Sequence, residues 1–215
     1  MGEPSTRIGL TVESVQRKLL MEIPRQASPN REERVKTTKY ITRAAIVLAL
    51  TIALQFAIRE LVPSAPPFNV VNLFLVGSIV NLGLLLATET TGLWAGVIIA
   101  IAAPVTAWFQ QHLVSPAMIP AVMAGNLLLV VLFWLVTRRS GSSDSWLRWI
   151  GLGLGAAAKM AFLYFAIGAI VGTLTKLPVA ATAFIRFSFS WPQFVTAVIG
   201  GVLSSLIARR IKPIS

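Results

Sequence analysis

Beyond about residue 40, the chain alternates between long apolar runs and short joints that contain Pro, Gly or charged residues. An α-helix needs about 20 consecutive, mostly apolar residues to cross a bilayer. Six runs are long enough, and they cover residues 41–59, 70–88, 92–110, 117–137, 147–173 and 190–208. This pattern predicts an all-α fold: a polytopic membrane protein built as a bundle of six transmembrane helices.

The segment before the first run is polar. Its stretch TVESVQRKLLMEI places apolar residues on one helical face and Arg17 and Lys18 on the other, which suits a short amphipathic helix at a membrane surface. A tail without a specific role is the alternative, and the following PRQASPNREER has the composition of a flexible linker. We therefore expect an N-terminal cytoplasmic tail (1–38), a membrane domain (39–210) and a C-terminal tail (211–215).

The composition agrees with a membrane protein. The chain is 55% hydrophobic and only 13% charged, and its mean hydropathy is +0.75, whereas soluble domains are about 45–50% apolar and about 25% charged. The net charge of +11 does not indicate a nucleic-acid partner, because no soluble domain is long enough to carry a basic face. Basic residues beside membrane spans instead meet the headgroups of membrane lipids.

The distribution of Lys and Arg predicts the orientation. With the N-terminus in the cytoplasm, fifteen of the 19 basic residues lie on the cytoplasmic side, and only Arg59, Lys176 and Arg186 lie outside. Cytoplasmic loops of membrane proteins carry such an excess. We expect a multi-pass protein of the cell (plasma) membrane with both termini cytoplasmic (N-in/C-in). The remaining basic residue, Lys159, belongs to neither side.

Lys159 is the one charged residue in the apolar run LGLGAAAKMAFLYFAIGAIVG. Near the middle of a bilayer, a lysine costs roughly 2.5–3.5 kcal/mol. No Asp or Glu lies in the middle of a predicted span, and the acids Glu60 and Glu89 lie at span ends. A buried cation without a protein partner either loses its proton or binds an anion. We therefore expect Lys159 to pair with a carboxylate or phosphate of a ligand.

Several amide side chains also fall within the predicted spans, where none can face lipid at low cost. At a rise of about 1.5 Å per residue, Asn81 and Asn126 lie near the depth of Lys159, and the others lie toward the outer ends. Together they outline a polar pocket that opens outward. The alternative is a structural role, in which these side chains form hydrogen bonds with one another and with backbone carbonyls. The candidate substrate-binding residues are Lys159, Asn126, Gln193, Asn72 and Gln110.

The sequence offers little support for enzyme chemistry. There is no cysteine, and the single histidine, His112, lies in a predicted outer loop, where we expect it to be incidental. The HExxH, GxSxG and P-loop motifs are absent. We therefore expect a non-enzymatic protein with no catalytic residue, no metal site and no cofactor bound by this chain.

The first apolar run contains small residues at an unbroken four-residue period, which places them on one helical face. In membranes, small residues let helices approach closely. The stripe serves either packing within the chain or docking of another protein's helix. It consists of Ala45, Ala49, Ala53 and Ala57.

Several segments resemble the substrate-binding S components of energy-coupling factor (ECF) transporters. They are MIPAVMAGNLLLVVLFWLV, GAAAKMAFLYF and FSWPQFVTAVIGGVLSSLIARR, together with the stretch from Asn69 to Gln110. The more specific marks are Gly125-Asn126, Lys159 within its apolar helix, and Trp191-Pro192-Gln193 followed by Gly200-Gly201. The resemblance covers roughly residues 38–210.

The resemblance implies a six-helix protein that captures a vitamin or related micronutrient near the outer face. Such a protein docks on a membrane T component driven by two cytoplasmic ABC ATPases, so that the partners use the ATP, and it topples to release its substrate inward. The resemblance further implies that Ala45, Ala49 and Ala53 contact the T component and that the loop from Arg59 to Asn69 forms part of a lid. The alternatives are a stand-alone secondary carrier or facilitator, and a membrane assembly or anchoring subunit without a transport role.

Overall fold

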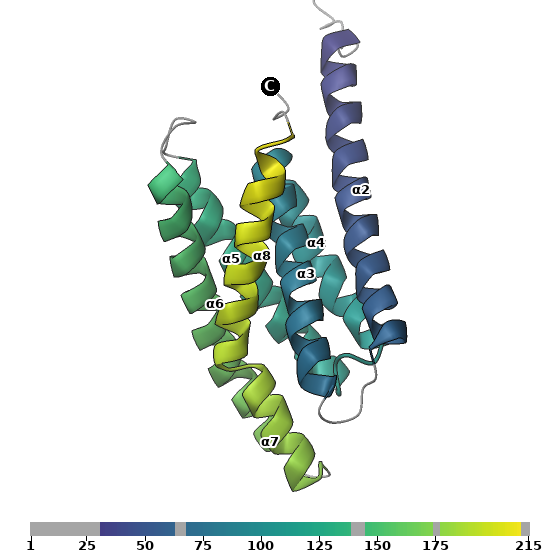
Figure 1. Ribbon diagram of the computed structural model, residues 1–215, viewed down its shortest axis with the longest axis vertical. Coiled ribbons are helices and arrows are strands. Elements are labelled where there is room, and N and C mark those ends of the chain that lie inside the picture. The colour runs from purple at the N-terminus through teal and green to yellow at the C-terminus, as the bar shows by residue number, and fades with distance from the viewer. Residues whose placement is uncertain (1–30, 63–67, 139–144, 174–176, 212–215) are drawn as a thin grey trace, which may run out of the picture. The chain divides into compact units, whose positions relative to one another are not determined.

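The computed structural model describes residues 31–62, 68–138, 145–173 and 177–211, and it divides the chain into two compact units, Met1–Thr38 and Lys39–Ser215. Every regular element of these described residues is a helix (Figure 1). In chain order the elements are α2 (Arg31–Leu61), α3 (Phe68–Thr90), α4 (Leu93–Phe109), the 3-10 turn η1 (Pro116–Met118), α5 (Ile119–Thr137), α6 (Ser145–Thr173), α7 (Val179–Ser188) and α8 (Trp191–Ala208).

The structure describes only residues 31–38 of the first unit, so the amphipathic helix predicted within residues 11–23 lies outside the described residues. The predicted flexible linker is wrong at its end, because α2 already begins at Arg31. The stretch REERVKTTKY contains no Pro or Gly to interrupt a helix, so the helix continues directly into the apolar run that follows.

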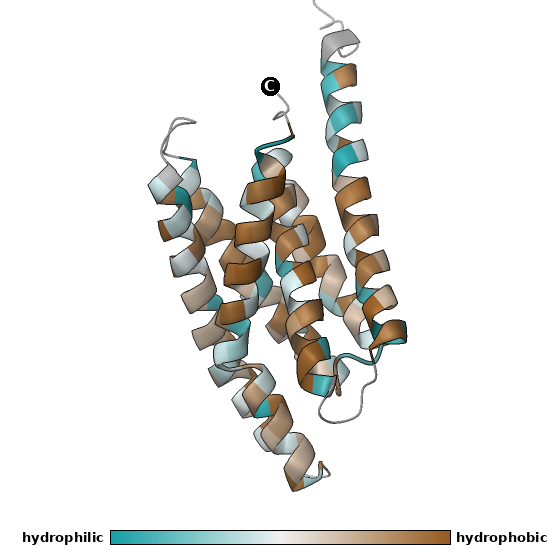
Figure 2. Cartoon of the chain, in the orientation of Figure 1, coloured by the Kyte–Doolittle hydropathy of each residue, from teal (hydrophilic) through white to brown (hydrophobic). Residues whose placement is uncertain are grey.

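Five segments are long and apolar enough to cross a membrane: Glu33–Leu61, Asn69–Thr90, Pro116–Thr137, Trp146–Thr173 and Val179–Ala208. Helix α4 is apolar but has 17 residues, which places it at the short limit for a span. Large apolar side chains are exposed on the helices, and hydrophobic residues, brown in Figure 2, run along much of each helix. The described part of the chain is all-helical, as predicted, and suits a multi-pass membrane protein. A sixth span and the orientation stay predictions.

The joint predicted between residues 173 and 190 is wrong in part, because it contains helix α7. This helix is amphipathic: Ile185 and Ser188 are buried, whereas Val179 and Arg186 are exposed. Small residues and Arg186 interrupt the apolar run, so a search for continuous apolar stretches overlooks it. The helix ends just before α8 starts at Trp191.

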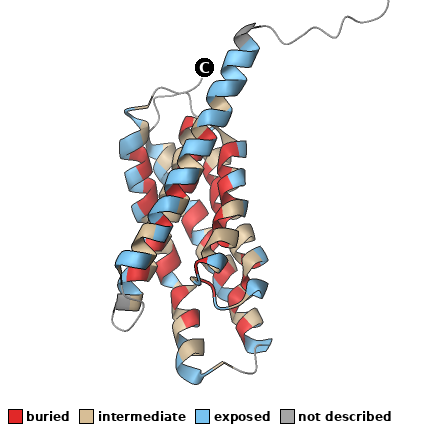
Figure 3. Cartoon of the chain, turned by 90° about the vertical axis from the view of Figure 1, so that its right-hand side faces the viewer, coloured by how far each residue is buried: buried red, intermediate tan, exposed pale blue. Residues whose placement is uncertain are grey.

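Helix α3 packs along α8, and α5 packs along α6, with α4 between α3 and α5 (Figure 1). Buried residues, red in Figure 3, lie on the inner faces of these helices. Gly200 allows the backbones of the two helices to approach closely, because a Cβ there would lie 2.6 Å from the backbone nitrogen of Leu82 and 2.7 Å from the carbonyl oxygen of Ser78. The α3–α8 contact therefore requires a residue without a side chain at this position.

The buried face of α6 passes through two separate apolar clusters. Leu152 and Ala156 belong to a cluster with residues of α3, α4 and α5, whereas Leu163 and Ile167 belong to a cluster with α7 and the start of α5. Lys159 lies between these pairs on the same helical face and is 3% exposed. The fold therefore places an ammonium group between two apolar clusters.

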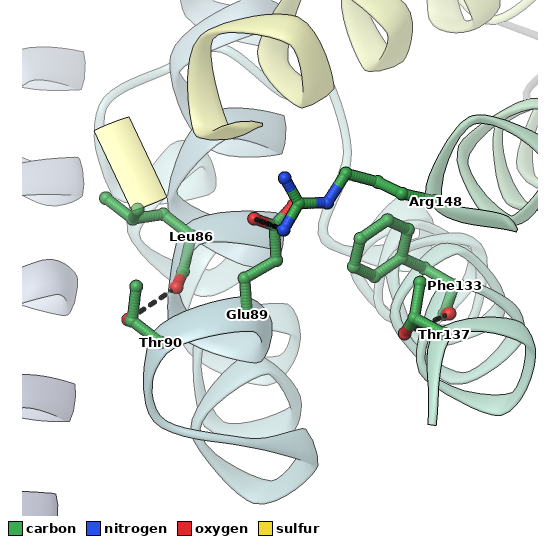
Figure 4. A network of polar contacts seen from close by, with 6 residues as sticks. All are labelled: Leu86, Glu89, Thr90, Phe133, Thr137 and Arg148. Atoms are coloured by element: carbon green, nitrogen blue, oxygen red, sulfur yellow. Dashed lines mark hydrogen bonds and ion pairs between the residues drawn. The ribbon is translucent and has the colours of Figure 1, made fainter. Parts of the chain in front are cut away.

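An ion pair joins α3 and α6 where α3 ends and α6 begins (Figure 4). The Arg148 guanidinium lies 3.2 Å from the Glu89 carboxylate, and the exposed fractions of the two side chains are 30% and 5%. Close by, Gly151 and Gly155 of α6 face the backbone of α5, with ideal Cβ positions 3.2 Å from the Phe133 oxygen and 3.0 Å from the Leu129 oxygen. We call this region the paired end of the bundle.

Candidate ligand cavity

A cavity of about 410 Å³ lies among the helices where α4 ends and α5 begins. Residues of α2 to α8 and of the loop between α4 and η1 line it. Its size falls in the range of small-molecule sites, which is about 300–1,000 Å³. The lining combines apolar side chains such as Val76 and Met118 with polar groups from several helices. We call this region the cavity end.

All five predicted substrate-binding residues line this one cavity, and all five are buried. They come from five helices: Lys159 from α6, Asn126 from α5, Gln193 from α8, Asn72 from α3 and Gln110 from the end of α4. The structure thus brings together residues that are as many as 121 positions apart, between Asn72 and Gln193. Whether each contacts a ligand stays a prediction.

The Lys159 ammonium has a protein partner, so the prediction that it has none is wrong. Lys159 Nζ donates a hydrogen bond of 2.6 Å to Asn81 Oδ1, and Asn81 Nδ2 donates one of 3.2 Å to Thr196 Oγ1. The partner is a neutral amide, which orients the ammonium but does not neutralise its charge. An ammonium has three N–H donors, and Asn81 Oδ1 is the acceptor among the described residues.

The predicted amides differ in how far the protein satisfies them. Gln193 Nε2 donates a hydrogen bond of 2.9 Å to the Ser188 carbonyl, which ties α8 to the end of α7. In contrast, three other predicted amides have buried polar atoms without a hydrogen-bond partner in the described structure. These are both polar side-chain atoms of Asn126, Oδ1 of Asn72 and Oε1 of Gln110. An unsatisfied buried polar atom costs about 1–3 kcal/mol. Gln193 therefore has the structural role of joining two helices, whereas Asn126 has no such role among the described residues.

Other polar lining residues were not among the predicted candidates. Gln55 and Asn81 carry a signal in the sequence, because each is a polar residue within a predicted span. Arg59, Gln111 and His112 carry none, because polar residues are ordinary at helix ends and in loops. Arg59 donates a hydrogen bond of 3.1 Å to Gln111 Oε1, which joins the end of α2 to the loop after α4. His112, which we expected to be incidental, forms part of the cavity wall, and its lack of a role stays a prediction.

The charged groups of the described lining are positive. They are Arg59 and Lys159, and no Asp or Glu belongs to this lining. Burial lowers the pKa of His112 below its ordinary value of about 6.5, the Gln110 backbone opposes this change, and the positive charge of Arg59 adds to it. His112 is therefore neutral at pH 7, and the cavity favours neutral or anionic molecules over cations.

Within the described residues, the alanine stripe of α2 lies on a largely exposed face, with Ala57 half-buried at its end. Ala45, Ala49 and Ala53 are exposed, whereas Thr51 and Gln55 on the opposite face are buried. The exposed face is smooth, because its small residues leave no projecting side chains, and larger apolar residues flank it, such as Leu50 at 56% exposure. This arrangement suits lipid or the helix of a partner protein.

Comparison of the chain with protein-family models, curated proteins and solved structures gave no match. The geometry by itself suits reversible binding of a small molecule: the cavity offers a buried lysine, several amide atoms without a hydrogen-bond partner in the described structure, and apolar walls.

Proposed function

We propose that this protein is the substrate-binding S component of an ECF-type importer, which captures a small polar or anionic micronutrient and delivers it across the membrane with ATP hydrolysed by partner subunits. The observation that carries the proposal is the cavity itself. Lys159 and four buried amides without complete hydrogen bonding converge there from five helices. A subunit that serves only for anchoring has no need of such a cavity.

Two further features support the partner-dependent form of the proposal. The exposed alanine stripe at Ala45, Ala49 and Ala53 offers a helix of a T component a smooth docking surface. The basic residues of the described chain also gather at the end opposite the cavity, as with Arg138, Arg148 and Arg209, and this distribution favours a cavity that opens to the outside.

Binding is tested by mass spectrometry of the small molecules released from purified full-length protein. We expect a predominant organic anion from the wild-type protein and its loss from Lys159→Met, because the buried cation then no longer attracts an anion. Ala157→Met is the matched control, since Ala157 is exposed on the same helix. Equal amounts of the compound from wild-type and Lys159→Met protein would contradict the proposed role of Lys159.

Transport is tested in liposomes with the compound identified in this way. We expect the protein alone to bind the compound without accumulating it, and accumulation to require a T component, two ABC ATPases and ATP. Uptake by this protein alone would instead favour a stand-alone carrier.

A further inference from the structure

The loop after α4 holds His112 in a defined position. Gln111 has a φ of 59°, in the left-handed region that non-glycine residues rarely occupy, and this turn reverses the chain at the end of α4. The Gln111 amide donates to the Trp108 carbonyl and the His112 amide to the Ala107 carbonyl, both at 2.9 Å. The hydrogen bond from Arg59 to the Gln111 side chain fixes the turn from a second helix. Three hydrogen bonds therefore hold the turn that places His112 in the cavity wall.

Both ring nitrogens of His112 are buried, and neither makes a well-aligned hydrogen bond in the described structure, although the Gln110 backbone lies near enough to the ring to favour its protonation. A neutral imidazole has one N–H donor and one nitrogen acceptor. Burial and the charge of Arg59 lower the pKa of the ring, so that it offers an acceptor nitrogen at pH 7. Asn and Gln side chains also accept hydrogen bonds but do not titrate, so only His112 makes this capacity depend on pH.

The charged and titratable groups that face the cavity are few. Helix α2 contributes Arg59, α6 contributes Lys159, and the loop contributes His112, whereas the lining residues of α3, α4, α5, α7 and α8 are uncharged. Lys159 lies midway along α6, and His112 lies in the loop at the end of α4. A ligand that fills the cavity therefore meets the Lys159 side chain within the bundle and a neutral acceptor near the end of the helices.

We propose that His112 is a second ligand-binding residue, which accepts a hydrogen bond from an N–H or O–H group of a small organic carboxylate whose anionic end pairs with Lys159. The inference rests on the proposed function and narrows its ligand class to carboxylates with a distant donor group. Protonation of His112 removes the acceptor and adds a positive charge beside Arg59. The affinity then falls as the pH decreases through the pKa of the ligand-free ring, by up to about tenfold per pH unit.

The test measures binding of defined probes to the detergent-solubilised full-length protein between pH 7.5 and 5.5. Biotin, pantothenate and orotate each have a carboxylate and a distant N–H or O–H group; lipoate and nicotinate have the carboxylate without the donor, and thiamine is a cation. We expect a probe of the first group to bind best and to bind more weakly at pH 5.5. Preferred binding of lipoate, nicotinate or thiamine, or no binding by the first group, would overturn the inference.

Variants separate a ligand contact from a structural role. His112→Asn keeps an acceptor that does not titrate, so we expect its affinity for the same probe to fall less than that of the wild-type protein between pH 7.5 and 5.5. His112→Phe keeps a ring without an acceptor, and we expect at least tenfold weaker binding at pH 7.5. Ala117→Ser, at an exposed position outside the cavity lining, is the control. Equal affinity of wild-type and His112→Phe protein contradicts the inference.

A readout without substitution is available because His112 is the only histidine of the chain. Protein labelled with ¹⁵N-histidine gives ring-nitrogen NMR signals from this residue alone, and the bound probe is expected to shift the acceptor nitrogen. Unchanged signals during saturable probe binding overturn the inference and leave the proposed function intact. If no small molecule binds or is released from the wild-type protein, both fail.

Discussion

The paired end and the cavity end of the bundle differ in whether a buried charge has an oppositely charged partner in the protein. At the paired end, the Glu89 carboxylate has a guanidinium at 3.2 Å, although neither of its oxygens makes a hydrogen bond among the described residues, and glycines bring α6 against α5. At the cavity end, the Lys159 ammonium has only a neutral amide, and Asn126 has no hydrogen-bond partner among the described residues. The same helices thus form a closely packed region at one end and, at the other, a cavity lined by polar atoms that make no hydrogen bond among the described residues.

Helix α6 takes part in both the paired end and the cavity end. Helix α6 contributes Arg148 to the ion pair and, eleven residues later, Lys159 to the cavity. At the first position the protein itself supplies the opposite charge, since Arg148 lies beside the Glu89 carboxylate. At the second position the protein supplies none, so that a ligand anion gains the electrostatic interaction on binding. Substitutions at the two ends should therefore differ in what they change.

The largest effect on stability is expected from Gly200→Val. The added side chain would overlap the backbone of α3, and overpacking of this kind costs typically about 1–3 kcal/mol, and more where backbone must move. The midpoint of thermal unfolding in detergent should fall strongly. Gly168→Val is the control, because nothing lies within 4 Å of a Cβ at Gly168. Equal unfolding midpoints for the two variants would refute the close α3–α8 contact.

Next in size is the effect of Glu89→Gln at the paired end. Breaking a fully buried pair costs about 3–5 kcal/mol, and we expect about 1–3 kcal/mol here because Arg148 is 30% exposed. Thermal unfolding and binding of the same probe are measured together. Stability should fall while affinity changes little. Lower affinity with unchanged stability would place Glu89 in the binding machinery instead.

Lys159→Met should show the opposite combination. Removal of a buried ammonium offsets the loss of the hydrogen bond to Asn81. The free energy of unfolding should therefore stay the same or rise by up to about 2 kcal/mol. Ligand binding should weaken by about 100-fold, as expected when a buried charge pair loses one partner. A destabilised protein that binds normally would show that Lys159 is structural.

The smallest effect concerns pH and the ligand-free protein. The pKa of His112 is lowered in the folded state, so the unfolded chain binds more protons below about pH 6.5. Stability from this group is complete above that pH and is lost as the pH falls through the folded-state pKa. The unfolding midpoint should therefore decrease from pH 7.5 to 5.5 more in wild-type than in His112→Asn protein. An identical decrease in both would mean that His112 does not titrate differently on folding.

The apolar pattern of the sequence was enough to predict the helical character of the described chain and most helix positions, because apolar runs of about 20 residues have few other stable arrangements. It also identified the polar residues that line the cavity from within helices, since a Lys or Asn in an apolar run is costly wherever it lies. It missed α7, whose amphipathic pattern is short, and it offered no sign that His112 would face a cavity.

The tertiary structure alone decided which groups meet. The contact of Lys159 with Asn81 joins residues 78 positions apart, and nothing in the local sequence of either specifies the other. The same holds for Glu89 with Arg148 and for the turn that brings His112 to the cavity wall. Apolar periodicity fixes where a helix forms and which face it buries, but the distance between two polar side chains depends on how the helices pack.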